Sequence, residues 1–292
     1  MRARVIGSVL VVVVGLVPVL VGGPVFALLM MILGVAGYRE FLELAGKVSL
    51  RGIGSYAQVG YLVVIALGCV ALFHESAVWL LAATFLAVVA PLVLLFSNPT
   101  FPDGFSGWSL ASAGSLYVGL PIYAAIAIRA SSGVIDAPWL SEASQRLAFG
   151  WHPAPRGLAW ALTVILVIWA ADSVAFLAGR AFGRQKLAPA ISPNKSWEGA
   201  IAGIVASMAV ATVSFRAFGL GGWWLGLVAG AVIGLTGQIG DLAESVLKRQ
   251  AGVKDSGSII PGHGGVLDRI DALLFAFPAG FLMAVGLERF GT

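Results

Sequence analysis

The acidic and basic side chains of this sequence gather near its C-terminus. Nine of the chain's 18 basic and 14 acidic residues lie between Asp241 and Asp271, although only 11% of all residues are charged. Asp241, Glu244 and Lys248 are spaced to share one face of a helix, and Asp268 and Asp271 share a face in the same way. Carboxylates in this arrangement could hold a hard cation such as Mg²⁺, which takes one or two protein carboxylates plus substrate phosphates.

A glycine-rich stretch, Pro-Gly-His-Gly-Gly at 261–265, separates these two groups of acids. Glycines let a backbone approach a ligand closely and turn its N–H groups towards an anion. Lys254, His263 and Arg269 add positive charge nearby. Acids, exposed amides and cations together favour a metal-bound polyphosphate such as a nucleoside triphosphate. The alternative interpretation is that the acids and bases of this region simply neutralise one another where a helix meets a loop.

A second charged stretch covers residues 179–199 and contains four cations: Arg180, Arg184, Lys186 and Lys195. Ser196 is predicted to cap the helix that follows, with Glu198 in its first turn. A capped helix N-terminus beside a lysine is an anion site. The bias of Lys and Arg towards cytoplasmic loops would alone explain about half of these cations. Asp172 lies inside the preceding apolar run, where an acid costs at least ~2.5–3.5 kcal/mol and usually pairs or binds a ligand.

The elements that must position these residues are apolar helices. Hydrophobic residues make up 59% of the chain and the mean hydropathy is +0.95, more than the interior of a soluble globule can hide. The sequence therefore predicts an all-α, polytopic membrane protein with about nine transmembrane helices. The expected spans are 5–22, 24–40, 57–73, 77–97, 109–129, 157–179, 199–218, 223–240 and 270–287.

The distribution of Lys and Arg predicts the orientation of the chain in the cell (inner) membrane. A cytoplasmic N-terminus puts thirteen of these residues inside and five outside, with both charged stretches on the cytoplasmic face. The same bias explains the net charge of +4 without a nucleic-acid partner. We expect one integral-membrane domain, 1–292, in which 1–130 supplies packing or a dimer contact and 157–292 forms the catalytic helices and loops.

Residues 245–271, S-V-L-K-R-Q-A-G-V-K-D-S-G-S-I-I-P-G-H-G-G-V-L-D-R-I-D, resemble throughout the signature of the phosphatidate cytidylyltransferases, or CDP-diacylglycerol synthases. That signature is Ser-x-aliphatic-Lys-Arg, four residues, Lys-Asp-x-small, two residues, aliphatic-Pro-x-His-Gly-Gly-aliphatic-x-Asp-Arg-aliphatic-Asp, and every fixed position is filled. Residues 172–199 are similar to the family's second shared region, with its Gly-Arg, Lys-Leu-x-Pro and Ser-Pro-x-Lys-Ser-x-Glu-Gly elements. The N-terminal half matches only as a set of apolar helices.

The resemblance implies that CTP and phosphatidic acid react to give CDP-diacylglycerol and diphosphate at the cytoplasmic face. It also implies a requirement for Mg²⁺, a second and monovalent cation such as K⁺, and a homodimer. The partners expected for the chain are therefore CTP, phosphatidic acid, membrane lipids and a second copy of itself. Spans six to nine are expected to leave a gap through which the diacylglycerol tails enter from the inner leaflet.

The candidate site residues fall into groups by expected role. The metal ligands are expected to be Asp241 and Asp268, with Asp271 and Asp172 as further candidates. The triphosphate is expected to be held by Lys254, Arg269 and the backbone of Gly262, His263, Gly264 and Gly265. The lipid phosphate is expected to contact Ser192, Lys195 and Arg180, although the two jobs could be exchanged. Either substrate could be served by Lys248 and Arg249. The residues expected to be catalytic are Asp241, Asp268, Lys254 and Arg269.

Two other functions share parts of this pattern. A CTP-dependent lipid kinase would also need a site for cytidine triphosphate. An ion-coupled transporter would explain Asp172 and Asp241 at membrane depth beside glycine-rich helices. The charges gather at one membrane face instead of lining a route through the midplane, and the two halves of the chain do not resemble each other. The transporter is therefore the less favoured interpretation.

Overall fold

The structure is a computed structural model that describes residues 15–48, 56–73, 77–97, 104–148, 151, 153–259 and 264–290. Residues 15–21 are helical, and the helices that follow are α2 (Gly23–Val48), α3 (Tyr56–Phe73), α4 (Ala77–Ser97), α5 (Gly104–Ala130) and α6 (Pro138–Leu147). The C-terminal part comprises α7 (Pro155–Phe182), β1 (Lys186–Ala188), β2 (Ser192–Ser196), α8 (Trp197–Phe218), α9 (Trp223–Gln250), α10 (Leu267–Ile270) and α11 (Leu273–Phe290).

The helices confirm an all-α membrane architecture. Seven of the described helical segments are long and apolar enough to cross a membrane, and α3 is a shorter apolar helix. Eight of the nine expected spans coincide with one of these helices, whereas most of the first, 5–22, lies outside the described residues. The eighth span differs in length, because α9 continues past residue 240 to Gln250. Good helix formers such as Leu, Ala, Glu and Lys carry the helix through the first group of acids.

A β-hairpin replaces the loop expected between the sixth and seventh spans. β1 and β2 pair antiparallel, with Lys186 opposite Ser196 and Ala188 opposite Ser192. The Ser196 side chain then accepts a hydrogen bond from the Gly199 N–H at 3.2 Å, which confirms the predicted cap of α8. The Glu198 carboxylate accepts from the N–H of Gln185 at 3.2 Å and ties the base of the hairpin to the helix start.

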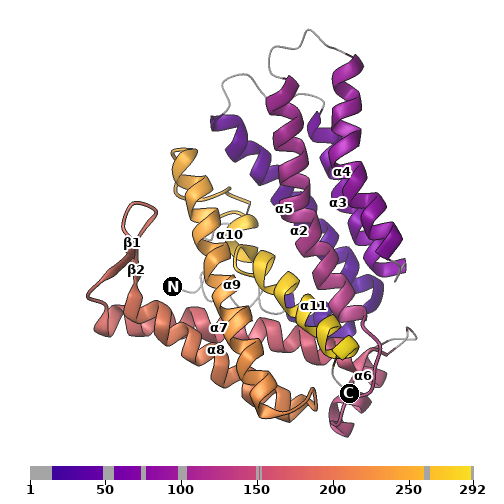
Figure 1. The fold of residues 1–292 in the computed structure, drawn as a ribbon, viewed down its shortest axis with the longest axis vertical. Helices are drawn as coiled ribbons and strands as arrows, with labels where there is room; N and C mark the ends of the chain where they lie inside the picture. The colour runs from indigo at the N-terminus through magenta and orange to yellow at the C-terminus, as the bar shows by residue number, and fades with distance from the viewer. Residues whose placement is uncertain are drawn as a thin grey trace.

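The helices form two groups joined by α11 (Figure 1). In the N-terminal group α5 packs against α2, α3 and α4, and in the C-terminal group α8 packs against α7 and α9. α11 contacts α5, α7 and α9 and so belongs to both groups. Figure 1 shows the hairpin projecting at the far left, at the end of α7 and α8 that is remote from α6.

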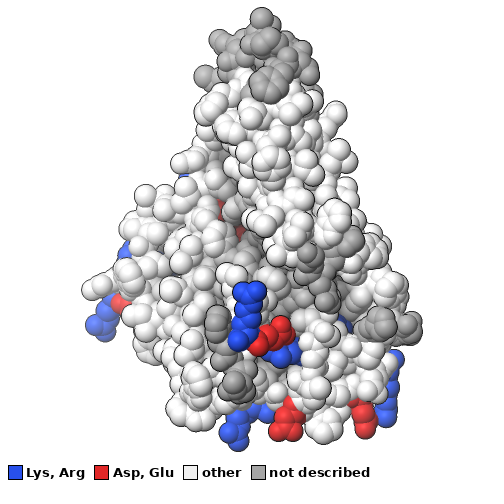
Figure 2. Space-filling model, turned by 45° about the vertical axis from the view of Figure 1, so that its right-hand side comes forward, with Lys and Arg blue, Asp and Glu red and all other residues white. Residues whose placement is uncertain are grey.

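Glycines let α9 pack very closely on its neighbours. A Cβ built on Gly226 would lie 2.9 Å from the carbonyl oxygen of Ala211, and one built on Gly230 would overlap the backbone of Ser207 and Met208. Close backbone approach through small residues is how helices associate in lipid, where apolar surface alone gives no preference. Most of the face in Figure 2 is uncharged, and its Lys, Arg, Asp and Glu side chains gather towards the lower end.

Candidate active site

The largest group of predicted site residues lines one cavity between α7, the hairpin, the start of α8 and α9. Its volume is about 540 Å³. The polar and glycine residues in its wall are Asp172, Gly179, Arg180, Lys186, Asn194, Lys195, Ser196, Gly199, Gln238 and Asp241. Four of the predicted residues, namely Asp172, Arg180, Lys195 and Asp241, therefore meet here. We call this space the polar cavity.

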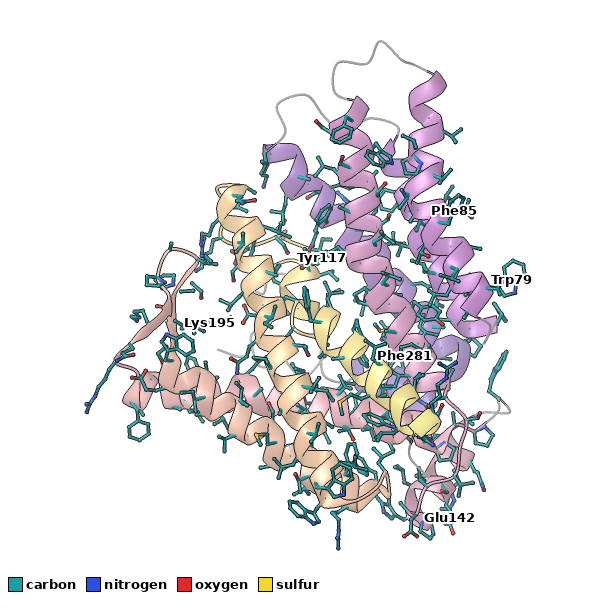
Figure 3. The ribbon with its side chains drawn as sticks, viewed as in Figure 1. Trp79, Phe85, Tyr117, Glu142, Lys195 and Phe281 are labelled. Atoms are coloured by element: carbon teal, nitrogen blue, oxygen red, sulfur yellow. The ribbon has the colours of Figure 1, made fainter. Side chains whose placement is uncertain are left out.

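An ion pair joins the hairpin to α9 across the polar cavity. Lys195 Nζ lies 2.6 Å from Asp241 Oδ2, and both side chains remain about one-third exposed, at 27% and 33%. Figure 3 labels Lys195 between the hairpin and α9. Asp172, on α7, interacts electrostatically with both members of the pair, repelling Asp241 and attracting Lys195. Lys195 thus interacts with both acids, and two further cations, Arg180 and Lys186, line the same cavity.

A second polar cluster lies further along α9, where Lys248 bridges two acids. Its Nζ lies 2.6 Å from Glu244 Oε2 and 2.6 Å from Asp268 Oδ1. The Glu244 side chain is fully buried, and those of Lys248 and Asp268 are 12% and 9% exposed. The spacing of Glu244 and Lys248 predicted their shared face, but Glu244 was not expected at the site. Such buried charges are kept only when they are paired and hydrogen-bonded.

Asp268 organises the loop that precedes it. Its Oδ2 accepts hydrogen bonds at 2.8 Å from the N–H of Ser256 and at 2.8 Å from the N–H of Gly265. Gly264 has φ +83°, in the left-handed region that glycine favours, and this turn brings Gly265 to the carboxylate. The carboxylate expected to ligate a metal is therefore occupied by a lysine and two backbone amides. Gly262 and His263 lie outside the described residues.

Glu40, from the N-terminal helix α2, is the residue that the sequence gave least reason to expect. It is 1% exposed, and its two carboxylate oxygens accept from the N–H groups of Val266 and Leu267 at 2.9 and 2.8 Å. Ser256 Oγ lies 2.9 Å from Glu40 Oε2 and 2.9 Å from Asp268 Oδ2, so its single hydrogen can be donated to either acid. The signal available in the sequence was an acidic residue within a long apolar helix, where an acid usually pairs or has a function.

Arg249 joins the two charged stretches of the sequence. Its Nε donates to the carbonyl of Ile191 in the hairpin at 3.1 Å, and Nη1 donates to the carbonyl of Val253 at 3.0 Å. Together with the pair of Lys195 and Asp241, this contact confirms that the stretches meet at one end of the molecule. Arg249 was expected to bind a substrate, whereas in the structure it braces the hairpin.

Several predicted residues lie apart from the polar cavity. Asp271 accepts from the N–H of Ala272 at 2.7 Å and interacts electrostatically with Asp241 and Asp172, although it is not part of the cavity wall. Ser192 and Lys254 are likewise outside that wall. Arg269 lines a different, apolar cavity, because adjacent residues on α10 point in different directions and Asp268 already faces Lys248.

The acids do not form a ready-made metal centre. Among the described residues no three Asp, Glu, His or Cys side chains are grouped closely enough to hold an ion. The pair of Asp172 and Asp241 nevertheless fits the chemistry of Mg²⁺, which is often held by one or two carboxylates together with substrate phosphates and water. Lys186, one of the four cations of the second charged stretch, adds a donor to the same wall, as do Asn194 and Gln238, which were not predicted.

Comparison with known proteins places this geometry in context. The cytidylyltransferase family matches residues 2–286. A phosphatidate cytidylyltransferase of Pseudomonas aeruginosa is 35% identical over 275 residues, covering 91% of this chain and 91% of that protein. One of Brucella abortus is 34% identical over 257 residues, covering 88% and 83%. A third, of Haemophilus influenzae, is 45% identical over 141 residues, and this match spans about half of that protein, 48%.

Proposed function

We propose, since the chain belongs to the cytidylyltransferase family, that it transfers the cytidylyl group of CTP to phosphatidic acid and releases diphosphate. The observation that carries this proposal is that the chain is similar, along nearly its whole length, to a phosphatidate cytidylyltransferase. The polar cavity supports it, because cations from the hairpin and acids from α7 and α9 line one space. A multi-pass membrane protein also suits a lipid substrate.

The reaction needs no covalent intermediate on the protein. An oxygen of the lipid phosphate attacks the α-phosphorus of CTP in line, and a new P–O bond forms. The bond from the α-phosphorus to the bridging oxygen breaks, and diphosphate leaves with that electron pair. Catalysis then consists of positioning and charge neutralisation. Arg180, Lys186 and Lys195 line the polar cavity and would neutralise the phosphates of both substrates.

Mg²⁺ is part of this proposal. Asp172 and Asp241 would hold it together with phosphate oxygens of CTP, because Mg²⁺ is typically bound by one or two carboxylates plus substrate phosphates, and both carboxylates line the polar cavity. When bound, the ion would supply charge screening of the triphosphate and orientation of the leaving group. A second, monovalent cation such as K⁺ and a homodimer remain expectations from the family resemblance.

We further propose that the polar cavity faces the cytoplasm and that the N-terminus is cytoplasmic. The contact between Arg249 and Ile191 lies at one end of the molecule, while Arg156 and Glu288 pair at 3.3 Å where α7 begins and α11 ends. Labelling by a membrane-impermeant maleimide tests this orientation. A cysteine in place of exposed Pro193, in a Cys69→Ala background, should react in inside-out vesicles and not in sealed right-side-out vesicles.

The decisive experiment uses purified protein, phosphatidic acid, CTP labelled at the α-phosphate and Mg²⁺, followed by lipid extraction and mass analysis. We expect a labelled lipid that is heavier by one CMP unit, and no product in the presence of a chelator. A lipid heavier by a single phosphate would identify a kinase instead. Accumulation of a labelled solute in liposomes without consumption of CTP would favour a transporter.

A further inference from the structure

A second cavity has a volume of about 340 Å³. It lies on the side of α10 opposite to the cluster of Glu244, Lys248 and Asp268. Its wall is made by residues 15–19 and by α2, α5, α7, α10 and α11. Every described residue in that wall is apolar or glycine, with the one exception of Arg269. We call this space the apolar cavity. It carries a single guanidinium in an otherwise hydrocarbon-like surface.

The two cavities follow one another along a single face of α7. Ile165 and Trp169 line the apolar cavity, and Asp172, Phe176 and Gly179 line the polar cavity. Their spacing of four, three, four and three residues places all five on one side of the helix. Trp169 and Asp172 are three positions apart, a rise of ~4.5 Å along the axis. The residues on this face of α7 therefore change from apolar to charged within one helical turn.

The short helix α10 makes the same division. Asp268 points to Lys248 and to the backbone of Ser256 and Gly265. Arg269, the next residue, contributes to the apolar cavity. Ile270 and Leu273 extend the apolar wall towards α11. A ligand that occupied both spaces would need an anionic end and a long hydrocarbon part, which is the chemistry of an anionic phospholipid.

We infer that the apolar cavity holds an acyl chain of the phosphatidic acid substrate, with Arg269 attracting its phosphate and the headgroup reaching the polar cavity beside Asp172. This inference rests on the proposed function and adds the location of the lipid tail. It differs from the expectation of a gap left by spans six to nine, because α2, α5 and residues 15–19 form much of the wall. It also moves Arg269 from the nucleotide to the lipid.

Filling the apolar cavity tests the inference through chain-length preference. Leu29→Trp on α2 adds bulk inside the wall, whereas Leu28→Trp adds the same bulk at a neighbouring position that is 58% exposed and outside the wall. Kinetics with dipalmitoyl and dioctanoyl phosphatidic acid give the ratio of kcat/KM for the long chain to that for the short chain. Each buried methylene contributes about fourfold to affinity. If Leu29→Trp displaces about two methylenes of the long chain, it should lower this ratio roughly 16-fold, with the KM for CTP unchanged.

One control variant and one variant of Arg269 complete the kinetic test. Leu28→Trp should leave the chain-length ratio at the wild-type value. Arg269→Gln should raise the KM for both lipids alike and leave the KM for CTP unaltered. An unchanged ratio in Leu29→Trp would overturn the acyl-chain site. A rise in the KM for CTP in Arg269→Gln would return that residue to the nucleotide and overturn its assignment to the lipid.

Photolabelling tests the site without relying on turnover. Phosphatidic acid with a diazirine in one acyl chain is irradiated with the wild-type protein in vesicles, and phosphatidylcholine with the same chain serves as the comparison. We expect labels on the peptides of Leu29 and Trp169 with phosphatidic acid, and several-fold less with phosphatidylcholine or with Leu29→Trp. Equal labelling by both lipids would overturn the inference. Selective labelling without nucleotide transfer would instead contradict the proposed function alone.

Discussion

The carboxylate of Glu40 accepts a hydrogen bond of 2.8 Å from the backbone N–H of Leu267, a residue 227 positions later in the chain. The same carboxylate accepts from Val266 at 2.9 Å. A helix of the N-terminal group thus holds the start of α10, where Asp268 meets Lys248. The sequence assigned residues 1–130 to packing or a dimer contact, and α2 from that part also holds Val266 and Leu267, next to the predicted site.

Removal of Glu40 should destabilise the protein strongly. Glu40→Ala leaves the N–H groups of Val266 and Leu267 without their acceptor in a buried place, at roughly 1–3 kcal/mol for each unsatisfied group. Thermal unfolding in detergent should show a clear drop in melting temperature. Glu43→Ala is the matched control on the same helix, because its ion pair with Arg39 is exposed and such pairs contribute about 0–1 kcal/mol. Equal melting temperatures for the two variants would contradict the role of Glu40.

Asp241 should matter for turnover more than for stability. Asp241 pairs with Lys195, and both side chains are partly exposed, so Asp241→Asn should fold normally. Loss of a carboxylate that neutralises charge in the reacting complex should lower kcat by about 10²–10³-fold. Glu142→Gln, on the surface helix α6, provides a carboxylate control and should retain full activity. Near-normal nucleotide transfer by Asp241→Asn would rule out its assignment to the metal.

Binding of Mg²⁺ should depend on the nucleotide. The described residues contain no group of three ligands for an ion, so Asp172 and Asp241 alone should bind Mg²⁺ weakly. Calorimetry should show a much higher affinity when Mg²⁺ is titrated in the presence of CTP. Asp172→Asn should reduce the gain in Mg²⁺ affinity that CTP produces, without changing the melting temperature. Tight binding of Mg²⁺ to the protein without CTP would show that other residues complete the site.

Arg249 should act through the hairpin and not through direct contact with a phosphate. Its guanidinium reaches two carbonyls, those of Ile191 and Val253, and a lysine has no second donor arm with this geometry. Arg249→Lys and Arg249→Ala should therefore lower kcat to a similar extent. Limited proteolysis should show faster cleavage within 185–196 in both variants. If Arg249→Lys is fully active, a positive charge is sufficient and the brace is not needed.

Arg129 should be required for folding. It is 4% exposed and donates to the carbonyls of Val19 at 2.6 Å, Leu20 at 3.1 Å and Ala154 at 3.3 Å. Arg129→Met would leave three carbonyls with fewer donors, and hydrogen bonds from charged groups contribute about 1.5–3 kcal/mol each. The yield of monodisperse protein should fall sharply. Arg146→Met, which removes an exposed ion pair on α6, should have little effect.

The sequence predicted the features that depend on local pattern. Apolar run lengths located the spans, and helical spacing placed Glu244 beside Lys248. The Ser196 cap followed from the preference of serine for that position. The meeting of 179–199 with α9 was also predicted, because both were expected at the same membrane face.

The features that the sequence did not predict depend on tertiary packing. In the hairpin, Lys186 and Ser196 pair across a turn. The residues between them, such as Ala-Pro-Ala-Ile-Ser, show little of the alternation between apolar and polar side chains that predicts a strand. Glu40 lies beside the exposed charges Arg39 and Glu43, and nothing local indicates that it accepts hydrogen bonds from residues 226 positions or more away. Arg269 follows Asp268 directly, so only the orientation of α10 shows that the two serve different cavities.

The glycines of α9 have a consequence for engineering. Replacing a glycine by alanine inside a helix normally gains ~0.8–1.0 kcal/mol through a more restricted unfolded chain. At Gly230 the added methyl group would collide with the backbone of Ser207, and at Gly240 it would lie 2.5 Å from the carbonyl oxygen of Asp271. Substitutions chosen by helix propensity alone would therefore push α9 away from α8 and from the backbone of Asp271. Thermostable variants of this protein should instead be sought on its exposed surfaces.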